Sequence, residues 1–350
     1  MEKIRFFYHE LEFFIAKKKG TNTVLNSTVN VLETTEIVRR ESELVNINLD
    51  AVKKYCSEWA LHPFITPPWD TSVHYDGQGD RLANYILLLD SLNFCFWPDK
   101  GQPKWTIEYK GQKMGGYQAL AASLKRAIEE GINVDDAHWM AQADMEQVRH
   151  VFRGTQEGVE IPLLDKRLEH INQSGQVLLD NFDGQYSQAI KSCQGSAVAL
   201  VNLMVQYFPS FRDIHTWKGQ EVRILKRAQI TAVDIYGSFY GKGLGEFKDM
   251  DLLTVFADYK IPQVLRALGI LEYSPALAEK VDNQELLPSG SREEMEIRVG
   301  MIWAVEEIRR ELKRLGAPKM ALELDWFLWN LGQEPLPGEK PYHRTRTIFY

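Results

Sequence analysis

The sequence of 350 residues contains few cysteines, no long apolar run and no excess of basic residues. The three cysteines, Cys56, Cys95 and Cys193, are odd in number and widely separated. They fit neither a disulfide framework nor a cysteine-rich metal site, and they favour a reducing compartment, with the cytoplasm as the default. No run of about 18 apolar residues is present, so no membrane span is expected. The opening residues 1–20 mix both charges and lack an A-x-A-type cleavage site, so no signal peptide is expected.

The charge balance argues against a protein that follows a nucleic-acid backbone. Lysine and arginine total 41 against 48 aspartates and glutamates, which gives a net charge of -7. Binding to duplex nucleic acid needs a clustered positive surface, so no duplex partner is expected. A local basic pocket for a single phosphate remains compatible with this balance. The 44% hydrophobic and 25% charged composition is ordinary for a soluble globular protein.

Several common catalytic motifs are absent from the sequence. It has no HExxH, no CxxC, no Walker lysine loop and no GxSxG elbow. The run Gly241-x-Gly243-x-Gly245 has the wrong spacing for a dinucleotide fingerprint and lacks an apolar, β-rich lead-in. We predict instead a hairpin between helices, in which glycine supplies positive φ and close backbone approach. Neither a metal nor a redox cofactor is expected.

Hydrophobic periodicity predicts one mainly α-helical domain. Residues 1–31 form an N-terminal extension, either a helix or a β-hairpin, and the domain spans residues 32–350. A short strand is predicted at residues 105–110, and no internal repeat or linker is evident. Helical patterns occupy residues 32–59, 85–96, 117–128 and 301–315, with several further helices between 135 and 207.

The stretch from Lys226 to Gln263 holds the first candidate for catalysis. Apolar residues recur there at the spacing of one helical face: Leu252, Val255, Phe256 and Tyr259. This spacing predicts a short helix with Asp251 as its N-cap, and Pro262 should stop that helix or open the next one. Asp258 then lies between two helix ends, where its surroundings can position the carboxylate for chemistry. The alternative is that Asp258 simply caps the helix beginning near Pro262.

The second candidate lies in residues 320–331, MALELDWFLWNL. One side of the predicted helix is an ordinary core face of Leu324, Phe327, Leu328 and Leu331. The other side carries Asp325, Trp326, Trp329 and Asn330. Two tryptophans beside a carboxylate are unusual on a solvent-facing helix, so this side is predicted to line a site. The alternative is that both tryptophans belong to the core and that Asp325 pairs with a nearby arginine.

Other polar residues have both a functional and a structural interpretation. His62, which precedes Pro63, is either a site residue or a loop histidine with satisfied hydrogen bonds. The pairs Lys226-Arg227 and Arg344/Arg346 can hold an anionic group, and the alternative for them is ordinary surface charge.

Eight motifs distributed along the chain closely resemble the queuosine salvage family. They are Leu61-His62-Pro63, Leu92-Asn93-Phe94-x-Phe96-Trp97, Phe208-Pro209-Ser210-Phe211-Arg212-Asp213, Lys226-Arg227-Ala228-Gln229, Phe247-Lys248-Asp249, Phe256-Ala257-Asp258-Tyr259, Leu324-Asp325-Trp326-x-Leu328-Trp329 and His343-Arg344-x-Arg346. The match runs from about residue 32 to residue 350. It implies a fold similar to helix-hairpin-helix DNA glycosylases. It also implies hydrolysis of queuosine 5'-phosphate to queuine and ribose 5-phosphate, which frees the base for insertion into tRNA.

The chemistry of that reaction fits the two candidate carboxylates. Breaking an N-glycosidic bond builds oxocarbenium-like charge on the sugar, which a fixed carboxylate can stabilise or attack. Queuine is a 7-deazapurine with a guanine-like edge and a cationic side chain, so an acidic, aromatic pocket suits it. We expect Asp258 to be the nucleophile or transition-state stabiliser and Asp325 to read the base, although these roles are interchangeable on sequence alone. Phe256 and Trp326 are expected to stack, and His62 to make a polar contact.

Two further expectations follow from the resemblance. The family usually has an acid where this chain has Asn330, and an asparagine cannot supply a charge at that position. Lys226 is the first candidate to hold the 5'-phosphate. Two other functions remain open, a glycosylase acting on a damaged DNA base and a non-catalytic module that binds nucleobases or modified tRNA. The net charge of -7 speaks against the first of them.

Overall fold

The computed structural model of the protein describes residues 28–61, 64 and 68–350. Most of the expected extension, and His62 with it, lies outside these residues. The described residues are mainly helical, as predicted. Their α-helices are α2 (Val31–Arg40), α3 (Leu49–Trp59), α4 (Gly79–Ser91), α5 (Gly116–Glu129), α6 (Ala137–Gln142), α7 (Met145–Val151), α8 (Leu164–Asn181), α9 (Tyr186–Ser192), α10 (Ala197–Tyr207), α11 (Lys226–Ser238), α12 (Lys260–Ala267), α13 (Pro275–Asp282), α14 (Arg292–Arg314) and α15 (Ala321–Leu331).

The strands described in the structure form three small antiparallel pairs. Two pairs are local hairpins, β2 (Thr106–Tyr109) with β3 (Gln112–Gly115) and β4 (Ile214–Trp217) with β5 (Gln220–Arg223). The first confirms the strand predicted at residues 105–110. The third pair joins distant parts of the chain, because β1 (Val45–Ile47) lies beside β6 (Leu271–Tyr273).

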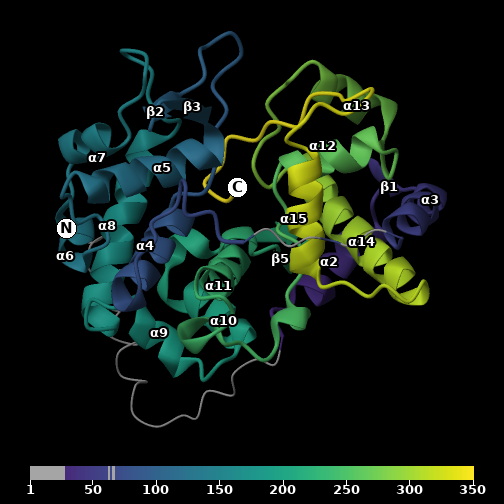
Figure 1. The fold of residues 1–350 in the computed structure, drawn as a ribbon. Coiled ribbons are helices and arrows are strands. Elements are labelled where there is room, and N and C mark those ends of the chain that lie inside the picture. The colour runs from purple at the N-terminus through teal and green to yellow at the C-terminus, as the bar shows by residue number, and fades with distance from the viewer. Residues whose placement is uncertain (1–27, 62–63, 65–67) are drawn as a thin grey trace, which may run out of the picture.

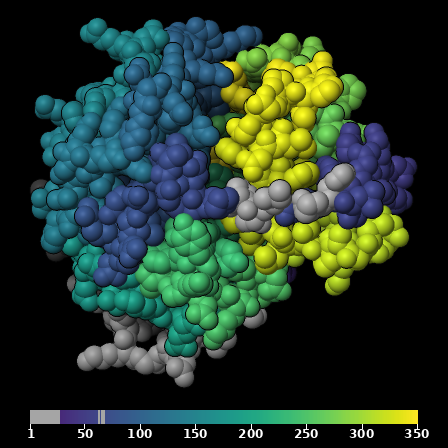
Figure 2. Space-filling view, in the orientation of Figure 1, coloured from purple at the N-terminus to yellow at the C-terminus, as the bar shows by residue number. Residues whose placement is uncertain are grey.

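The helices form two groups that face each other across the molecule (Figure 1). Helices α4 to α9 lie on one side, and α12 to α15 lie on the other together with α2 and α3. In the space-filling view the yellow C-terminal segment lies against the blue first third of the chain (Figure 2). This contact is specific, because the backbone N–H of Cys95 donates to the carbonyl of Tyr350 at 2.9 Å. None of the helices in the described part of the chain is both long and apolar enough to cross a membrane.

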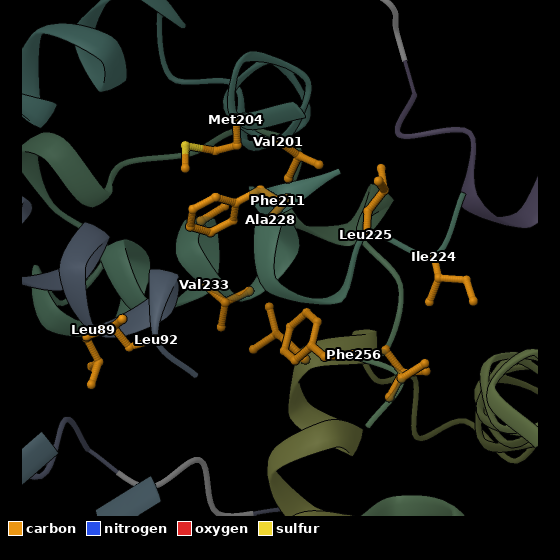
Figure 3. Packing of buried hydrophobic residues seen from close by; sticks show 14 of the residues in the cluster. Leu89, Leu92, Val201, Met204, Phe211, Ile224, Leu225, Ala228, Val233 and Phe256 are labelled. Carbon is orange, nitrogen blue, oxygen red and sulfur yellow. The ribbon is translucent and has the colours of Figure 1, made fainter. Parts of the chain in front are cut away.

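The hydrophobic core runs between the two groups through α4, α10 and α11 (Figure 3). Helix α11 is buried along most of its length, because it packs against both α4 and α10. Phe256, which follows α11 in the chain, lies in the same core beside Val233 (Figure 3). The core therefore fixes the stretch that carries the first candidate site.

The helix predicted over residues 252–259 is wrong. A 3-10 helix, η3 (Met250–Leu252), is followed by residues 253–258, which belong to no helix or strand, begin with an extended Leu253 and are called the extended segment below. Side chains of other helices occupy the backbone groups of this segment. The amide oxygen of Gln229 accepts from the N–H of Thr254 at 2.8 Å, and Asp325 Oδ1 accepts from the N–H of Phe256 at 3.1 Å. The apolar spacing reflects burial on several sides and not one helical face.

Two other segments that were each predicted as one helix are interrupted in the structure. The pattern over residues 32–59 splits into α2, β1 and α3. Helix α4 ends at Ser91, and residues 92–97 are not helical because the guanidinium of Arg167 takes the carbonyls of Leu92, Phe94 and Cys95. Those carbonyls cannot then serve a continuing helix.

The glycine run confirms the predicted backbone roles of glycine. Gly241 and Gly243 have φ of 67° and 56°. A Cβ at Gly245 would lie 2.8 Å from the carbonyl oxygen of Ile235, so only glycine fits that contact. The run forms a turn after α11 that includes the short 3-10 helix η2 (Gly243–Gly245), and it does not join two α-helices directly.

Candidate active site

Three elements meet where the sequence motifs place the candidate carboxylates. Lys226 begins α11, residues 253–258 form the extended segment, and Asp325 lies in the first half of α15. The 3.1 Å hydrogen bond from the Phe256 N–H to Asp325 Oδ1 joins the extended segment to α15. Segments distant in sequence therefore bring Lys226, Asp258 and Asp325 into one polar site.

Asp258 caps α12 and remains half-buried. Its Oδ1 accepts the backbone N–H groups of Lys260 at 3.0 Å and Ile261 at 2.9 Å, so the capping alternative is confirmed. Among the described residues none donates a hydrogen bond to Oδ2. The positive end of the helix dipole favours the carboxylate form. Asp258 is thus held rigidly by one oxygen while the other is left for a ligand, so capping does not compete with chemistry. Pro262 lies in the first turn of α12, which confirms that it opens this helix.

The pKa values of the two carboxyl groups are raised to different extents. Burial raises the pKa of Asp258, against the opposing charge of Lys226 and the two capping N–H groups. Burial, and then the negative charge of Asp258, raise the pKa of Asp325 well above its ordinary value. Of the two carboxyls, Asp325 is therefore suited to hold a proton while Asp258 remains the anion. Opposed environments of this kind are what separate an acid from a base in one site.

Lys226 is the cation of the site. Its residue is 5% exposed, so the surface-charge alternative is wrong for it. The ammonium donates to the carbonyl of Asn93 at 3.4 Å. Burial lowers the pKa of Lys226 to about 8, while the charges of Asp258 and Asp325 act to raise it. The charges of both carboxylates therefore favour the charged form of this buried ammonium.

Two acidic residues of the site, Asp90 and Asp234, are not predicted by any sequence motif. Asp90 in α4 is fully buried, and neither of its carboxyl oxygens has a hydrogen-bond partner among the described residues. Burial and the charge of Asp234 raise the pKa of Asp90 well above its ordinary value, and burial raises that of Asp234 in α11 to about 7. Both act on Lys226 or Asp325 through their charges. One signal was available, since Asp90 is the one carboxylate in the apolar run from Tyr85 to Phe96.

The aromatic candidates occupy different environments. Phe256 is 3% exposed and is part of the core, whereas Trp326 is half-buried. Asn330 is exposed, about one turn of α15 beyond Trp326. The core face predicted for α15 is confirmed at Leu324 and Leu328, which are fully buried.

The proposed arginine partner of Asp325 is not observed. Within residues 28–61, 64 and 68–350, no arginine forms an ion pair with Asp325, which instead accepts the N–H of Phe256. Arg227 is also not a surface charge, because it is 1% exposed and donates to the carbonyls of Asp90, Ser91 and Ser210.

The two C-terminal arginines are engaged elsewhere. Arg346 pairs with Asp99, and Arg344 donates to the carbonyl of Pro98 at 3.3 Å. Both guanidinium groups also lie over the ring of Trp97. The part of the chain that the structure describes contains no group of three or more histidine, cysteine, aspartate or glutamate side chains arranged to hold a metal ion. All three cysteines are free and buried, which confirms that they form no disulfide framework.

Comparison with known proteins places this site in a family. The family model described as queuosine salvage protein matches residues 73–350. A protein named queuosine 5'-phosphate N-glycosylase/hydrolase from Sphaerobacter thermophilus is 48% identical over 322 residues, which cover 92% of this chain and 98% of the relative. Proteins of the same name from Mus musculus and Schizosaccharomyces pombe are 35% and 34% identical; they cover 96% and 86% of this chain, and 99% and 90% of their own lengths. The chain therefore belongs to the queuosine salvage protein family.

Proposed function

We propose that this protein hydrolyses the N-glycosidic bond of queuosine 5'-phosphate and releases queuine for salvage into tRNA. The observation that carries the proposal is the pair of half-buried Asp258 and buried Asp325, in a chain whose relatives bear the name of that activity. One member of the pair is suited to be an anion and the other to hold a proton. Cleavage of a glycosidic bond requires both.

Asp258 acts on the sugar. Because Oδ1 is held by the N–H groups of Lys260 and Ile261, the position of Oδ2 is fixed without substrate. Oδ2 stabilises the positive charge that develops at the anomeric carbon, or forms a bond to that carbon as the bond to the base nitrogen breaks. Water then completes the hydrolysis and yields ribose 5-phosphate.

Asp325 acts on the base. In a 7-deazapurine the position of N7 is a carbon, so the leaving base cannot be activated by protonation there. A carboxyl with a raised pKa next to the base can supply the proton elsewhere on it, and can read its guanine-like edge. Phe256 and Trp326 flank the base, and His62 adds a polar contact. Asn330 can offer the substrate an amide but no charge.

The proposal also includes the domain boundaries, the fold type, the cellular compartment and the absence of cofactors. The catalytic domain spans residues 32–350, with residues 1–31 as an extension, and its helical arrangement is of the helix-hairpin-helix DNA glycosylase type. The enzyme works in the cytoplasm on a small nucleotide, without a metal, a redox cofactor or duplex nucleic acid. The net charge of -7 and the buried thiols of all three cysteines support this setting.

A direct assay tests the activity. The protein is incubated with queuosine 5'-phosphate, and free queuine is sought by mass spectrometry. A parallel reaction with duplex DNA that carries a damaged base tests the alternative glycosylase function. Release of queuine alone supports the proposal, whereas intact nucleotide after long incubation rejects it.

Lys226→Ala should weaken the use of the nucleotide more than that of the nucleoside. A 5'-phosphate carries close to two negative charges, and the buried ammonium of Lys226 is a cation available to meet it. Hydrogen bonds to charged groups contribute about 1.5–3 kcal/mol, so kcat/KM for queuosine 5'-phosphate should fall roughly 10- to 150-fold. The value for queuosine should change little.

Measuring kcat/KM with both substrates in both proteins decides between two roles of Lys226. An equal loss on nucleotide and nucleoside means that Lys226 serves the neighbouring carboxylates and not the phosphate. Lys280→Ala is the matched control, because Lys280 pairs with Glu293 near the surface, and it should leave both values unchanged.

A further inference from the structure

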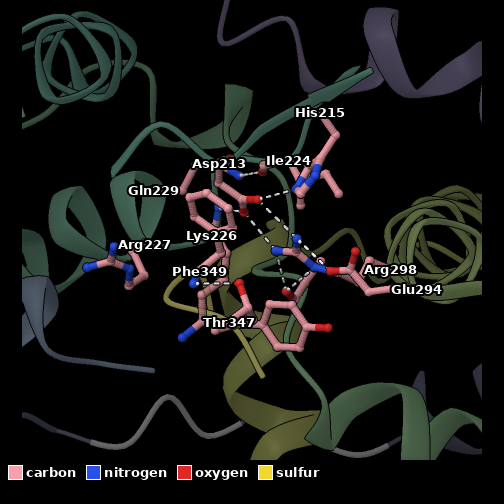
Figure 4. A network of polar contacts seen from close by, with 12 residues as sticks. Asp213, His215, Ile224, Lys226, Arg227, Gln229, Glu294, Arg298, Thr347 and Phe349 are labelled. Carbon is pink, nitrogen blue, oxygen red and sulfur yellow. Dashed lines mark hydrogen bonds and ion pairs between the residues drawn. The ribbon is translucent and has the colours of Figure 1, made fainter. Parts of the chain in front are cut away.

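Behind the site, Arg298 of α14 connects the extended segment to the start of α11 (Figure 4). Its guanidinium forms a two-pronged ion pair with Asp213, Nη1 to Oδ1 at 3.0 Å and Nη2 to Oδ2 at 2.7 Å. The same group donates to the carbonyl of Ala257, from Nε at 3.1 Å and from Nη2 at 3.0 Å. Ala257 is the residue between Phe256 and Asp258. Arg298 therefore holds the backbone immediately before the catalytic carboxylate.

Asp213 holds the other side of the site. Its Oδ2 accepts the backbone N–H of Lys226 at 3.2 Å, and its carbonyl accepts the N–H of Ile224 at 3.0 Å. Between them, Leu225 has a φ of 56°, a left-handed conformation that is unfavourable for leucine. Such a residue keeps this conformation only where its surroundings over-determine it. Asp213 supplies these contacts and so fixes where α11, and Lys226 with it, begins.

The pair is closed to any ligand. Arg298 is fully buried, with Tyr350 against its guanidinium at 4.2 Å and Glu294 Oε1 at 3.4 Å from Nη1. His215 Nε2 lies 2.9 Å from Asp213 Oδ1. Every charged group of this cluster is thus occupied by another part of the protein. Arg298 and Asp213 cannot touch the substrate, and they act only through Ala257 and Lys226.

We propose that Arg298 and Asp213 are positioning residues, whose ion pair sets the placement of Asp258 relative to Lys226. The inference rests on the proposed function, in which Asp258 reacts at the sugar. A buried ion pair is weak evidence for stability, since apolar residues of similar volume often replace one without loss. Here the pair does what apolar residues cannot do, because it also binds the carbonyl of Ala257 and the N–H of Lys226, which belong to two different segments of the site. Only a planar guanidinium can reach Asp213 twice and Ala257 at the same time.

Arg298→Lys tests the proposal. Lysine keeps the charge opposite Asp213 but lacks the fork, so the carbonyl of Ala257 loses its donors. A displacement of about 1 Å can cost about 10²-fold in rate, and kcat for queuosine 5'-phosphate should fall toward that extent with KM nearly unchanged. Amide hydrogen exchange at residues 253–258 should become faster, because this segment is released from α14. A merely structural role would lower the melting temperature without this division between kcat and KM.

Arg126→Lys is the matched control. Arg126, like Arg298, donates to the backbone, in its case to the carbonyls of Val151 and Arg153 at 3.0 and 3.1 Å, but these contacts do not involve the site. This variant should retain wild-type kcat and wild-type exchange at residues 253–258. A wild-type kcat together with unchanged exchange in folded Arg298→Lys would overturn the proposal.

A second variant distinguishes misfolding of Arg298→Lys from failure of the proposal. Asp213→Asn keeps the size of the side chain and an acceptor for the N–H of Lys226 while it removes the charge; it should show the same loss of kcat. If Arg298→Lys does not fold, this variant decides, and a wild-type kcat in it rejects the pair as positioning residues. If the wild-type protein does not cleave queuosine 5'-phosphate, the proposed function fails. The exchange measurement still tests in that case whether the pair holds residues 253–258.

Discussion

Asp258→Asn should lower kcat for queuosine 5'-phosphate by about 10²–10⁴-fold, the range for the loss of one catalytic acid–base or electrostatic group. An asparagine still offers an oxygen to the N–H groups of Lys260 and Ile261, so the cap of α12 and the local fold persist. The substitution removes the negative charge at Oδ2, the carboxylate oxygen that does not cap α12. Binding of the nucleotide should therefore remain measurable while turnover is almost abolished.

The measurement compares single-turnover rates with binding affinities. Asp251→Asn is the matched control, because Asp251 is an exposed aspartate of the same stretch and its side chain makes no contact with the site. Near wild-type turnover in Asp258→Asn would reject the assignment of Asp258. If Asp325→Asn instead loses turnover and keeps affinity, the roles of the two carboxylates are exchanged.

Asp213→Ala should destabilise the fold by about 3–5 kcal/mol, the usual cost of leaving one member of a buried ion pair without its partner. Arg298 would keep its charge. Among the described residues, the one carboxylate left at salt-bridge distance would be Glu294, whose Oε1 lies 3.4 Å from Nη1 of Arg298. The N–H of Lys226 would also lose its acceptor. Since domains are stable by only about 5–15 kcal/mol, this loss is a large fraction of the total.

The pH dependence of that loss has a definite sign. Burial alone would raise the pKa of Asp213, but the charge of Arg298 and the hydrogen bonds from His215 and Arg298 outweigh it and hold the pKa well below its usual range. A lowered pKa contributes stability that is fully present above the unfolded value of about 3.9 and is lost as the pH falls through the folded pKa. The difference between wild type and Asp213→Ala should therefore be constant near neutral pH and narrow only in strong acid.

Urea unfolding at several pH values measures this difference. Asp99→Ala is the control, since Asp99 pairs with Arg346 while remaining 71% exposed, and exposed pairs contribute about 0–1 kcal/mol. A loss in Asp213→Ala no larger than in this control would contradict the prediction. So would a difference that grows as the pH falls.

The elements predictable from sequence are those whose backbone contacts are local. Helix α12 begins at Lys260, with Pro262 in its first turn and Asp258 as its cap, and α15 presents Leu324 and Leu328 to the core, because capping and helical periodicity act within a few residues. The same local patterns wrongly predict a helix for the extended segment from Leu253 to Asp258. Its hydrogen-bond partners are the side chains of Gln229 in α11, Arg298 in α14 and Asp325 in α15, which no local pattern contains.

The site shows the same division. Asp258 and Asp325 stood out because each lies beside aromatic residues in a familiar motif, and the structure brings them together around Lys226. Asp90 and Asp234 did not, because neither lies in a motif with other candidate site residues. Their importance arises from the packing of α4 against α11, which places two carboxyls in one interior.

The pairing of β1 with β6 has a consequence for synthesis on the ribosome. Asn46 donates to the side chain of Glu272 across this pair, and the two residues are 226 positions apart. At about 5–20 residues per second, roughly 10–45 s pass between the emergence of the first strand and that of its partner. Helices α2 and α3 pack against α14, which is made later still, so they also wait. Helix α3 therefore stays without α14 as its packing partner throughout this interval, and we expect chaperones to bind the nascent chain at this stage.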